Sequence, residues 1–157
     1  MSLGPIKHDD EDLPYCNNLE NYFQYNKVYE KEVDSNGKIK KEFYEMRIKG
    51  YKDDKPHRRK YTKQDKCLYS LWKDKKYNYI ESRYFYCHYY EMLAKKEDDY
   101  KHLVKLINKG YNIMICGYDA YEMNENNVKE SYLSVDKPFG HERVLYTMLR
   151  GVKYPWL

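Results

Sequence analysis

The sequence lacks the patterns that place a chain at once among metal, membrane or phosphate-loop proteins. Its four cysteines are scattered, with no C-x-x-C pair and no histidine at zinc-ligand spacing. No apolar run approaches the roughly 18 residues that a membrane span needs. No internal repeat, Walker loop, G-x-G-x-x-G, nucleophile elbow or H-E-x-x-H motif occurs. These absences argue against a structural metal, a membrane segment and the common nucleotide-binding loops.

The same absences carry an expectation about compartment. Scattered cysteines are typical of free thiols in a reducing environment, and the first residues show no charged-then-apolar export signal. We therefore expect a soluble cytoplasmic protein. Lys, Tyr and Asn are abundant, as an AT-rich genome would make them, and for a viral chain the compartment would be the host cytoplasm.

The chain also has only a small excess of basic over acidic residues. The net charge is +4 and the pI about 8.6, which is compatible with a phosphate-bearing ligand but below the density of a dedicated DNA-binding protein. The 21 tyrosines dominate the apolar fraction of 41%. Because each hydroxyl needs a polar partner, many of these rings are expected at the edge of the core or along a cleft.

At 157 residues the chain suits one domain, residues 1–157, with an irregular N-terminal segment at 1–18 in which residues 3–6 could form an edge strand. We predict a compact, helix-rich α+β fold of about five helices and a few short strands. The expected helices are 19–33, 38–49, 77–96, 100–109 and a last one that opens at 136–138 and ends at Gly151. The turn at 34–37 could instead close a hairpin, and Gly50 suits the position after a helix. Residues 67–72 read as a buried turn or short strand, 111–116 as the clearest strand, and 122–135 as a loop.

The first predicted helix carries a polar row on one face. Glu20, Gln24, Lys27 and Lys31 recur at helical spacing, so an acid, an amide and a cation line up one turn after another. One interpretation is a solvated face with weak ion pairing. The other is a substrate-facing row, in which Glu20 activates water or stabilises a cation and Gln24 bonds to a heterocycle or a ribose.

Further candidate residues lie later in the chain. Asp119, flanked by Tyr118, follows the predicted strand, where loops often hold ligand-contacting residues, although an ordinary turn aspartate fits equally. His141 lies in the first turn of the last helix, where free N–H groups attract phosphate. Arg83 is a cleft-facing cation or half of a surface ion pair. The basic stretch 51–66 is a surface loop or the lip of a binding cleft.

Residues 20–28 (ENYFQYNKV) resemble the Glu-His-Tyr-Phe-Gln-x-x-Lys-Phe helix of the NADAR/YbiA-like N-glycosidases. In that family a Pro-hydrophobic pair precedes the helix, as in residues 3–6 (LGPI) here. The family's last helix, Gly-Lys-Asn-x-Leu-Gly-x-x-Leu-Met-x-x-Arg, is similar in length, position and apolar pattern to residues 140–150 (GHERVLYTMLR). The resemblance covers most of the chain in order, and the first motif is its specific part.

The resemblance implies hydrolysis of an N-glycosidic bond in a nucleotide-like or ADP-ribosylated substrate, without metal or cofactor. Glu20 would be the catalytic carboxylate and Asp119 would bind ribose or share the acid–base work. The resemblance places Asn21 and Gln24 against base or ribose, and it directs three cations toward phosphate: Lys27, Arg83 and His141. Tyr118 joins the binding residues beside Asp119.

Three positions depart from the family pattern. Asn21 replaces a histidine, residues 117–119 lack the Trp-Gly element, and His141-Glu142 replaces Lys-Asn. These departures predict either another substrate or a fold without activity. Two other classes of function stay open. One is a non-enzymatic module that binds a nucleotide or single-stranded nucleic acid on the basic, tyrosine-rich stretch 51–61. The other is a viral or host-interaction protein without a small ligand.

Overall fold

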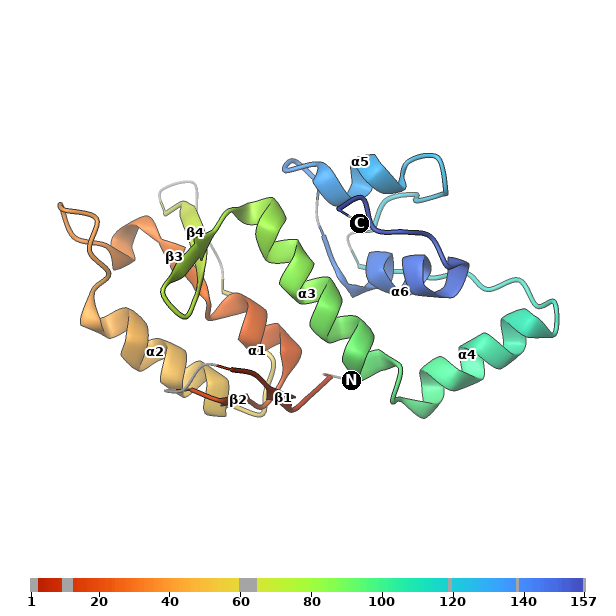
Figure 1. Cartoon of the computed structure of the whole chain (residues 1–157), viewed down its shortest axis with the longest axis horizontal. Coiled ribbons are helices and arrows are strands. Elements are labelled where there is room, and N and C mark those ends of the chain that lie inside the picture. Colours follow the sequence, from red (N-terminus) through yellow and green to blue (C-terminus); the bar gives the residue numbers. More distant parts are fainter. Residues whose placement is uncertain (1–2, 10–12, 60–64, 119, 138, 157) are drawn as a thin grey trace. The chain divides into compact units, whose positions relative to one another are not determined.

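The computed structural model describes residues 3–9, 13–59, 65–118, 120–137 and 139–156. Within these ranges the chain forms six α-helices and two small antiparallel sheets (Figure 1). The predicted helix-rich α+β class is therefore confirmed. The chain divides into two compact units, Met1–Ser82 and Arg83–Leu157, and each is described by itself. That both belong to one domain stays a prediction.

The first unit combines the two sheets with two helices. Its elements are, in order, β1 (Ile6–Lys7), β2 (Tyr15–Cys16), α1 (Leu19–Gln24), β3 (Lys27–Tyr29), the 3-10 turn η1 (Glu30–Glu32), α2 (Lys41–Lys52), β4 (Cys67–Trp72) and β5 (Lys75–Tyr77). The strands β1 and β2 pair antiparallel, and the second sheet has the order β3-β4-β5. The strand alternative for 67–72 is thus observed, whereas the edge strand expected at residues 3–6 forms only from Ile6 and extends to Lys7.

A small apolar core joins the second sheet to α2. Val28 from β3, Leu71 from β4 and Phe43 from α2 are buried against one another, with Val33 and Met46 packed beside them. Short as they are, these strands are stabilised because each contributes a side chain to this core. The core therefore fixes β3, which carries Lys27.

The first helix is much shorter than the predicted 19–33. It begins as expected, because the side chain of Asn18 caps it by accepting a bond from the backbone N–H of Asn21 at 2.9 Å. It ends after Gln24, where the Asn26 side chain donates to the carbonyl of Tyr22 at 2.8 Å. A side chain that satisfies a terminal carbonyl competes with a further helical turn. Residues 27–29 consequently form a strand.

The second helix is also displaced from its prediction. It spans Lys41–Lys52 instead of 38–49, after a turn at Gly37 that is closed by a bridge between Val33 and Ile39. Gly50 does not end the helix but lies inside it, buried beneath the ring of Tyr25. A Cβ atom at Gly50 would lie only 2.3 Å from that ring. The glycine thus permits close packing, which periodicity alone does not reveal.

The second unit is almost wholly helical. The long helix α3 (Tyr79–Ala94) crosses the boundary into it and is followed by α4 (Asp98–Asn108), α5 (Val128–Leu133) and α6 (His141–Arg150). The predictions for α3 and α4 are confirmed. Residues 111–116 form no strand, so that prediction is wrong, and α5 occupies part of the predicted loop 122–135. The last helix opens at His141, later than expected, and ends at Gly151 as predicted.

The core of this unit is built around one tyrosine. Tyr132 of α5 is fully buried, and its hydroxyl lies 2.7 Å from the hydroxyl of Thr147 on α6. The rings of Phe139 and Trp156 each pack edge-on against it with centroids 5.3 Å away. Edge-to-face rings with a satisfied hydroxyl allow a tyrosine-rich core to stay dry.

We predict that Gly50→Ala lowers the free energy of unfolding by roughly 1–3 kcal/mol, because the added methyl group overlaps the Tyr25 ring. Helix propensity alone would instead favour alanine by about 1 kcal/mol. Urea unfolding measures the change, and the double variant with Tyr25→Ala is the control. If the clash is the cause, Gly50→Ala should cost little or become stabilising in that background. An equal loss in both backgrounds would show that the Tyr25 ring is not the cause.

Candidate functional site

Three residues of the predicted polar row lie together where α1 passes into β3. The side-chain Nε2 of Gln24 donates to Oε1 of Glu20 at 2.8 Å, and Nζ of Lys27 donates to Oε1 of Gln24 at 3.1 Å. The acid, the amide and the cation thus form one hydrogen-bonded chain, although Lys27 lies on a strand. Lys31 leaves the row and pairs with Asp65 at 2.6 Å. We call Glu20, Gln24 and Lys27 the polar row.

Burial gives the polar row its electrostatic character. Gln24 is buried, while Glu20 and Lys27 are half-buried. Burial lowers the pKa of Lys27 to about 8, an effect that Cys67 and Glu20 oppose. The ammonium group lies 4.4 Å from the centre of the Phe23 ring, which compensates part of the lost hydration. The row is therefore a partly desolvated anion–cation pair bridged by an amide.

A half-buried arginine supports the strand under the row. Nη1 of Arg59 donates to the carbonyl of Lys27 at 2.5 Å. Nη2 of the same guanidinium pairs with the shielded carboxylate of Glu32. The guanidinium also lies over the ring of Tyr29, 4.6 Å from its centre. Glu32 accepts a second bond from the backbone N–H of Tyr29. The basic stretch 51–66 was expected to be a surface loop or the lip of a binding cleft. Arg59, one of its cations, instead holds β3 and Glu32 in place.

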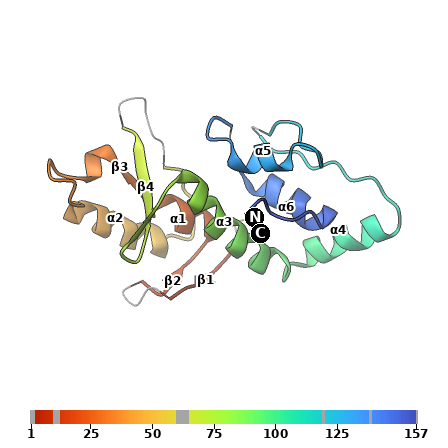
Figure 2. The same cartoon turned by 45° about the horizontal axis from the view of Figure 1, so that its top comes forward.

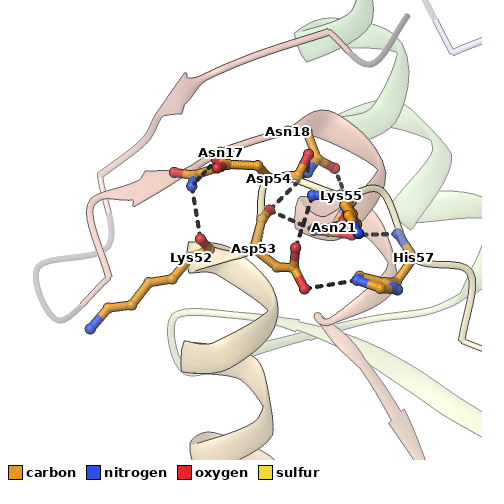
Figure 3. Close-up of polar contacts among 8 residues, drawn as sticks. All are labelled: Asn17, Asn18, Asn21, Lys52, Asp53, Asp54, Lys55 and His57. Carbon is orange, nitrogen blue, oxygen red and sulfur yellow. Dashed lines mark hydrogen bonds and ion pairs between the residues drawn. The ribbon is translucent and has the colours of Figure 1, made fainter.

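Asn21 has a different environment from its neighbours in the motif. Its side chain is 0% exposed, and its Nδ2 donates to the carbonyls of Asp53 at 3.0 Å and Lys55 at 2.9 Å. Its Oδ1 accepts from the backbone N–H of His57 at 2.8 Å. Figure 3 shows these bonds fastening the loop after α2. Asn21 thus positions this loop, and contact with a substrate stays a prediction.

Two further asparagines fasten the same loop from the start of α1. Asn17 donates to the carbonyl of Lys52 and to a carboxylate oxygen of Asp54, and Asn18 donates to the carbonyl of Asp53 (Figure 3). A run of N-N-x-x-N could have been recognised as a source of backbone-binding amides, since asparagine often bonds to nearby main chain. Their partners could not have been predicted, because Lys52 lies 35 residues after Asn17 and Asp53 lies 35 residues after Asn18.

The loop also carries a histidine–carboxylate contact that sequence reasoning missed. Nε2 of His57 lies 2.8 Å from Oδ2 of Asp53, four residues away along the chain. A backbone bond from Lys55, followed by the His57 contact, holds the pKa of Asp53 below its usual value. Both side chains are well exposed, so the pair orients the loop more than it stabilises the fold.

The remaining predicted residues belong to the second unit. Arg83 is fully buried, where it donates to the carbonyl of Tyr132 at 2.6 Å and lies over the ring of Phe139, so it is neither on a cleft surface nor in a surface ion pair. His141 is exposed at the start of α6, and its ring stacks on that of Tyr90. Tyr118 is fully exposed. Asp119 lies outside the described residues.

Sequence reasoning overlooked a buried charged pair beside His141. Glu142 and Arg143 are both almost fully buried, with Nε of the arginine 3.9 Å from the carboxylate. The glutamate lies against two glycines, because a Cβ atom at Gly140 or Gly117 would approach it to 2.4 or 3.0 Å. Arg143 also stacks over Tyr121, 3.4 Å from the ring centre. The glycine directly before α6 was the available clue.

The described residues contain neither a metal cluster nor a membrane span. No three His, Cys, Asp or Glu side chains among them gather in a way that could hold a metal ion. In the same part of the chain, no helix has both the length and the apolar character that a bilayer span requires. Comparisons with protein-family models, curated proteins and solved structures gave no match. The resemblance to the NADAR/YbiA-like family therefore rests on the motif and stays a prediction.

We predict that Lys27→Met raises the free energy of unfolding by roughly 1–2 kcal/mol at pH 7, because it removes a desolvated charge. This figure is the net gain after about 1 kcal/mol is lost with the hydrogen bond to Gln24. The buried ammonium is costly wherever both states carry the proton, which is below about pH 8. The gain should disappear as the pH rises from 8 to the ordinary value of 10.5, because the folded state then loses its charge first. Urea unfolding at pH 7 and pH 10 measures both effects. Exposed Lys49→Met is the control and should change neither, whereas destabilisation by Lys27→Met at pH 7 would contradict the prediction.

We predict that Asn21→Ala lowers the free energy of unfolding by roughly 1–3 kcal/mol, since it removes three partly buried hydrogen bonds between α1 and the loop. The amide proton of His57 should also exchange faster, which NMR hydrogen exchange measures directly. Asn17→Ala removes a more exposed asparagine from the same loop and should cost less. Unchanged stability together with unchanged exchange at His57 would show that Asn21 does not position the loop.

Proposed function

We propose that the chain hydrolyses an N-glycosidic bond in a nucleotide-like or ADP-ribosylated substrate, with Glu20 as the catalytic carboxylate. The observation that carries this proposal is the polar row itself. A carboxylate, an amide and a half-buried ammonium are joined by hydrogen bonds of 2.8 and 3.1 Å. The same residues form the specific part of the motif shared with the N-glycosidases.

The chemistry requires a carboxylate whose position is fixed. Cleavage of the bond between the sugar C1′ and the base nitrogen passes through a cationic, oxocarbenium-like state. A nearby carboxylate stabilises that charge and can orient the attacking water. Gln24 holds one oxygen of Glu20, which leaves the other oxygen for water or for the sugar. Gln24 is accordingly proposed to position Glu20 as well as to contact base or ribose.

The ammonium group of Lys27 has the character of an anion site. A cation that is already stripped of much of its water loses little further hydration when a phosphate binds. Among the described residues, the hydrogen bond of this ammonium goes to the neutral amide of Gln24 and not to a carboxylate. A phosphate would supply the missing negative charge and raise the pKa of Lys27. Phosphate contacts by Arg83 and His141, and roles for Tyr118 and Asp119, stay predictions from the sequence, because these residues belong to the second unit. For Arg83 the structure speaks against such a contact, since its guanidinium is buried under Phe139 and bonds to the carbonyl of Tyr132.

A second candidate function is supported by the cations around the row. The positive charges of Arg58 and Arg59 act on Lys27, and Arg59 lies over the ring of Tyr29. Clustered cations beside aromatic rings are typical of surfaces that bind nucleotides or single-stranded nucleic acid without chemistry. This binding function would depend on salt concentration and not on Glu20.

We predict that Glu20→Gln lowers the rate of N-glycoside cleavage roughly 100-fold or more, the usual size of such a carboxylate effect. The protein is incubated with NAD, ADP-ribosylated guanine and a ribosylated amine, and release of ADP-ribose or ribose phosphate is followed by chromatography. Glu30→Gln removes an exposed carboxylate from the same unit and is the matched control. A chelator should leave the rate unchanged if the reaction is independent of metal.

Two outcomes would decide against the catalytic proposal. If the wild-type protein releases product and Glu20→Gln does so equally fast, Glu20 is not the catalytic carboxylate. If the folded protein releases nothing but binds the nucleotide or an oligonucleotide in a salt-dependent way, and Glu20→Gln binds equally well, the binding function takes its place.

A further inference from the structure

The turn between η1 and α2 presents the dipeptide Asn36-Gly37 to solvent. Residues 34–38 are all exposed, and in both views this stretch projects away from β3 and α2 (Figure 1 and Figure 2). Asn36 is the only asparagine of the sequence that is followed by glycine. Its backbone N–H is bonded within the turn, but no hydrogen bond among the described residues engages its side-chain amide.

An asparagine before a glycine carries two groups that can react with each other. The backbone nitrogen of Gly37 can attack the side-chain carbonyl carbon of Asn36 and close a succinimide ring. The new carbon–nitrogen bond replaces the bond to the side-chain nitrogen, which leaves as ammonia with the proton of the Gly37 amide. Water then adds to one of the two ring carbonyls and opens the ring. The product is aspartate or, when the backbone now runs through the former side chain, isoaspartate.

Gly37 removes the steric obstacle to this attack. Its φ is +75°, a left-handed conformation that glycine adopts without strain. Apart from its chain neighbours, no heavy atom lies within 4 Å of the place where a Cβ atom would stand. A branched side chain at this position would shield the attacking nitrogen, whereas here the side chain of Asn36 can approach it freely once the turn opens.

The hydrogen bonds of the closed turn hold the reacting nitrogen back. The backbone N–H of Gly37 donates to the carbonyl of Asp34 at 3.0 Å. The Oδ1 atom of the same aspartate accepts from the backbone N–H groups of Asn36 and Lys38, each at 2.9 Å. An N–H group that is committed to such a bond must be released before its nitrogen can attack. The reaction therefore proceeds from the locally opened turn, and Asp34 governs how often the turn opens.

We propose that Asn36 is a site of spontaneous covalent modification, which passes through a succinimide to aspartate and isoaspartate at a rate controlled by Asp34. The proposal rests on three observations: the exposed and unbonded side-chain amide, the unhindered glycine after it, and the bonds that close the turn. It is independent of the polar row and of any activity of the chain.

The isoaspartate product acts on more than the turn. Val33 and Ile39 form a bridge on either side of it, and both pack against the apolar core that joins the second sheet to α2. Isoaspartate adds one carbon atom to the backbone between them, so the two side chains no longer meet in the same register. Aspartate adds a charge but leaves the backbone unchanged. Isoaspartate should therefore loosen the core, and aspartate should not.

The test is incubation of the full-length protein at physiological temperature and pH, followed by peptide mapping with mass spectrometry and by labelling with an isoaspartyl methyltransferase. Asn36 should convert faster than Asn112, which is also exposed but precedes the β-branched Ile113. Asp34→Ala should convert roughly 10-fold faster, the factor that corresponds to about 1.4 kcal/mol of lost turn stability. Asp34→Asn keeps one side-chain oxygen as an acceptor and should lie between the two.

The purified product gives a second readout. The isoaspartate form is separated by ion-exchange chromatography, and its urea unfolding is compared with that of the wild type and of Asn36→Asp. The isoaspartate form should unfold at a lower urea concentration, while Asn36→Asp, which introduces the charge alone, should match the wild type. Asn36→Gln should yield neither product, because its longer side chain does not form the succinimide ring.

Three results would overturn the proposal or one of its parts. Conversion at Asn36 that is no faster than at Asn112 would exclude the modification site. An unchanged rate in Asp34→Ala, with circular dichroism equal to that of the wild type, would exclude control by the turn; if Asp34→Ala does not fold, Asp34→Asn provides the same comparison. An isoaspartate form as stable as Asn36→Asp would exclude the effect on the core.

Discussion

The buried amide of Asn26 is the constraint on which the candidate site depends. Its Nδ2 donates to the carbonyl of Tyr22, its Oδ1 accepts from the hydroxyl of Tyr51 at 2.9 Å, and its backbone carbonyl accepts from the N–H of Leu71. One residue thus ends α1, ties it to α2 and starts the pairing with β4. Because the chain turns here, Lys27 enters a strand and still reaches back to Gln24. Without this turn the row would continue along a solvated helix.

The charges near this turn are arranged at a cost to stability. Arg59 and Glu32 are desolvated together, and such pairs often contribute little net stability even when their geometry is good. Lys27 is less well compensated, because its hydrogen bond goes to a neutral amide and burial lowers its pKa. An apolar side chain would suit the fold better at this position. A costly cation beside a fixed carboxylate is more easily understood as part of a binding or catalytic site.

Sequence patterns located most helices, but not the helix ends that depend on contacts between elements. The cap at Asn18, the long helix α3 and the glycine that ends α4 follow from local rules, since their determinants lie within a few residues. Tyr51 bonds to the asparagine that ends α1, and Tyr25 covers the glycine inside α2. Each tyrosine is distant in sequence from the position it affects, so periodicity extended α1 too far and the rule that glycine follows a helix ended α2 too early. In the candidate site, the order Glu20-Gln24-Lys27 was predictable, whereas the loop-fastening role of Asn21 was not. Asn21 bonds to residues more than 30 positions away.

Residues 111–116, which were predicted to form a strand and do not, show the limit of strand propensity most clearly. Tyr111, Ile113 and Ile115 are strong strand formers, but a strand also needs a neighbour to accept its backbone bonds. In the described part of the chain no such neighbour pairs with this segment, and the backbone N–H of Tyr111 instead donates back to the carbonyl of Leu106 at the end of α4. The apolar pattern of residues 111–116 therefore identified side chains that suit a strand, but only pairing with a second strand would have made the segment one.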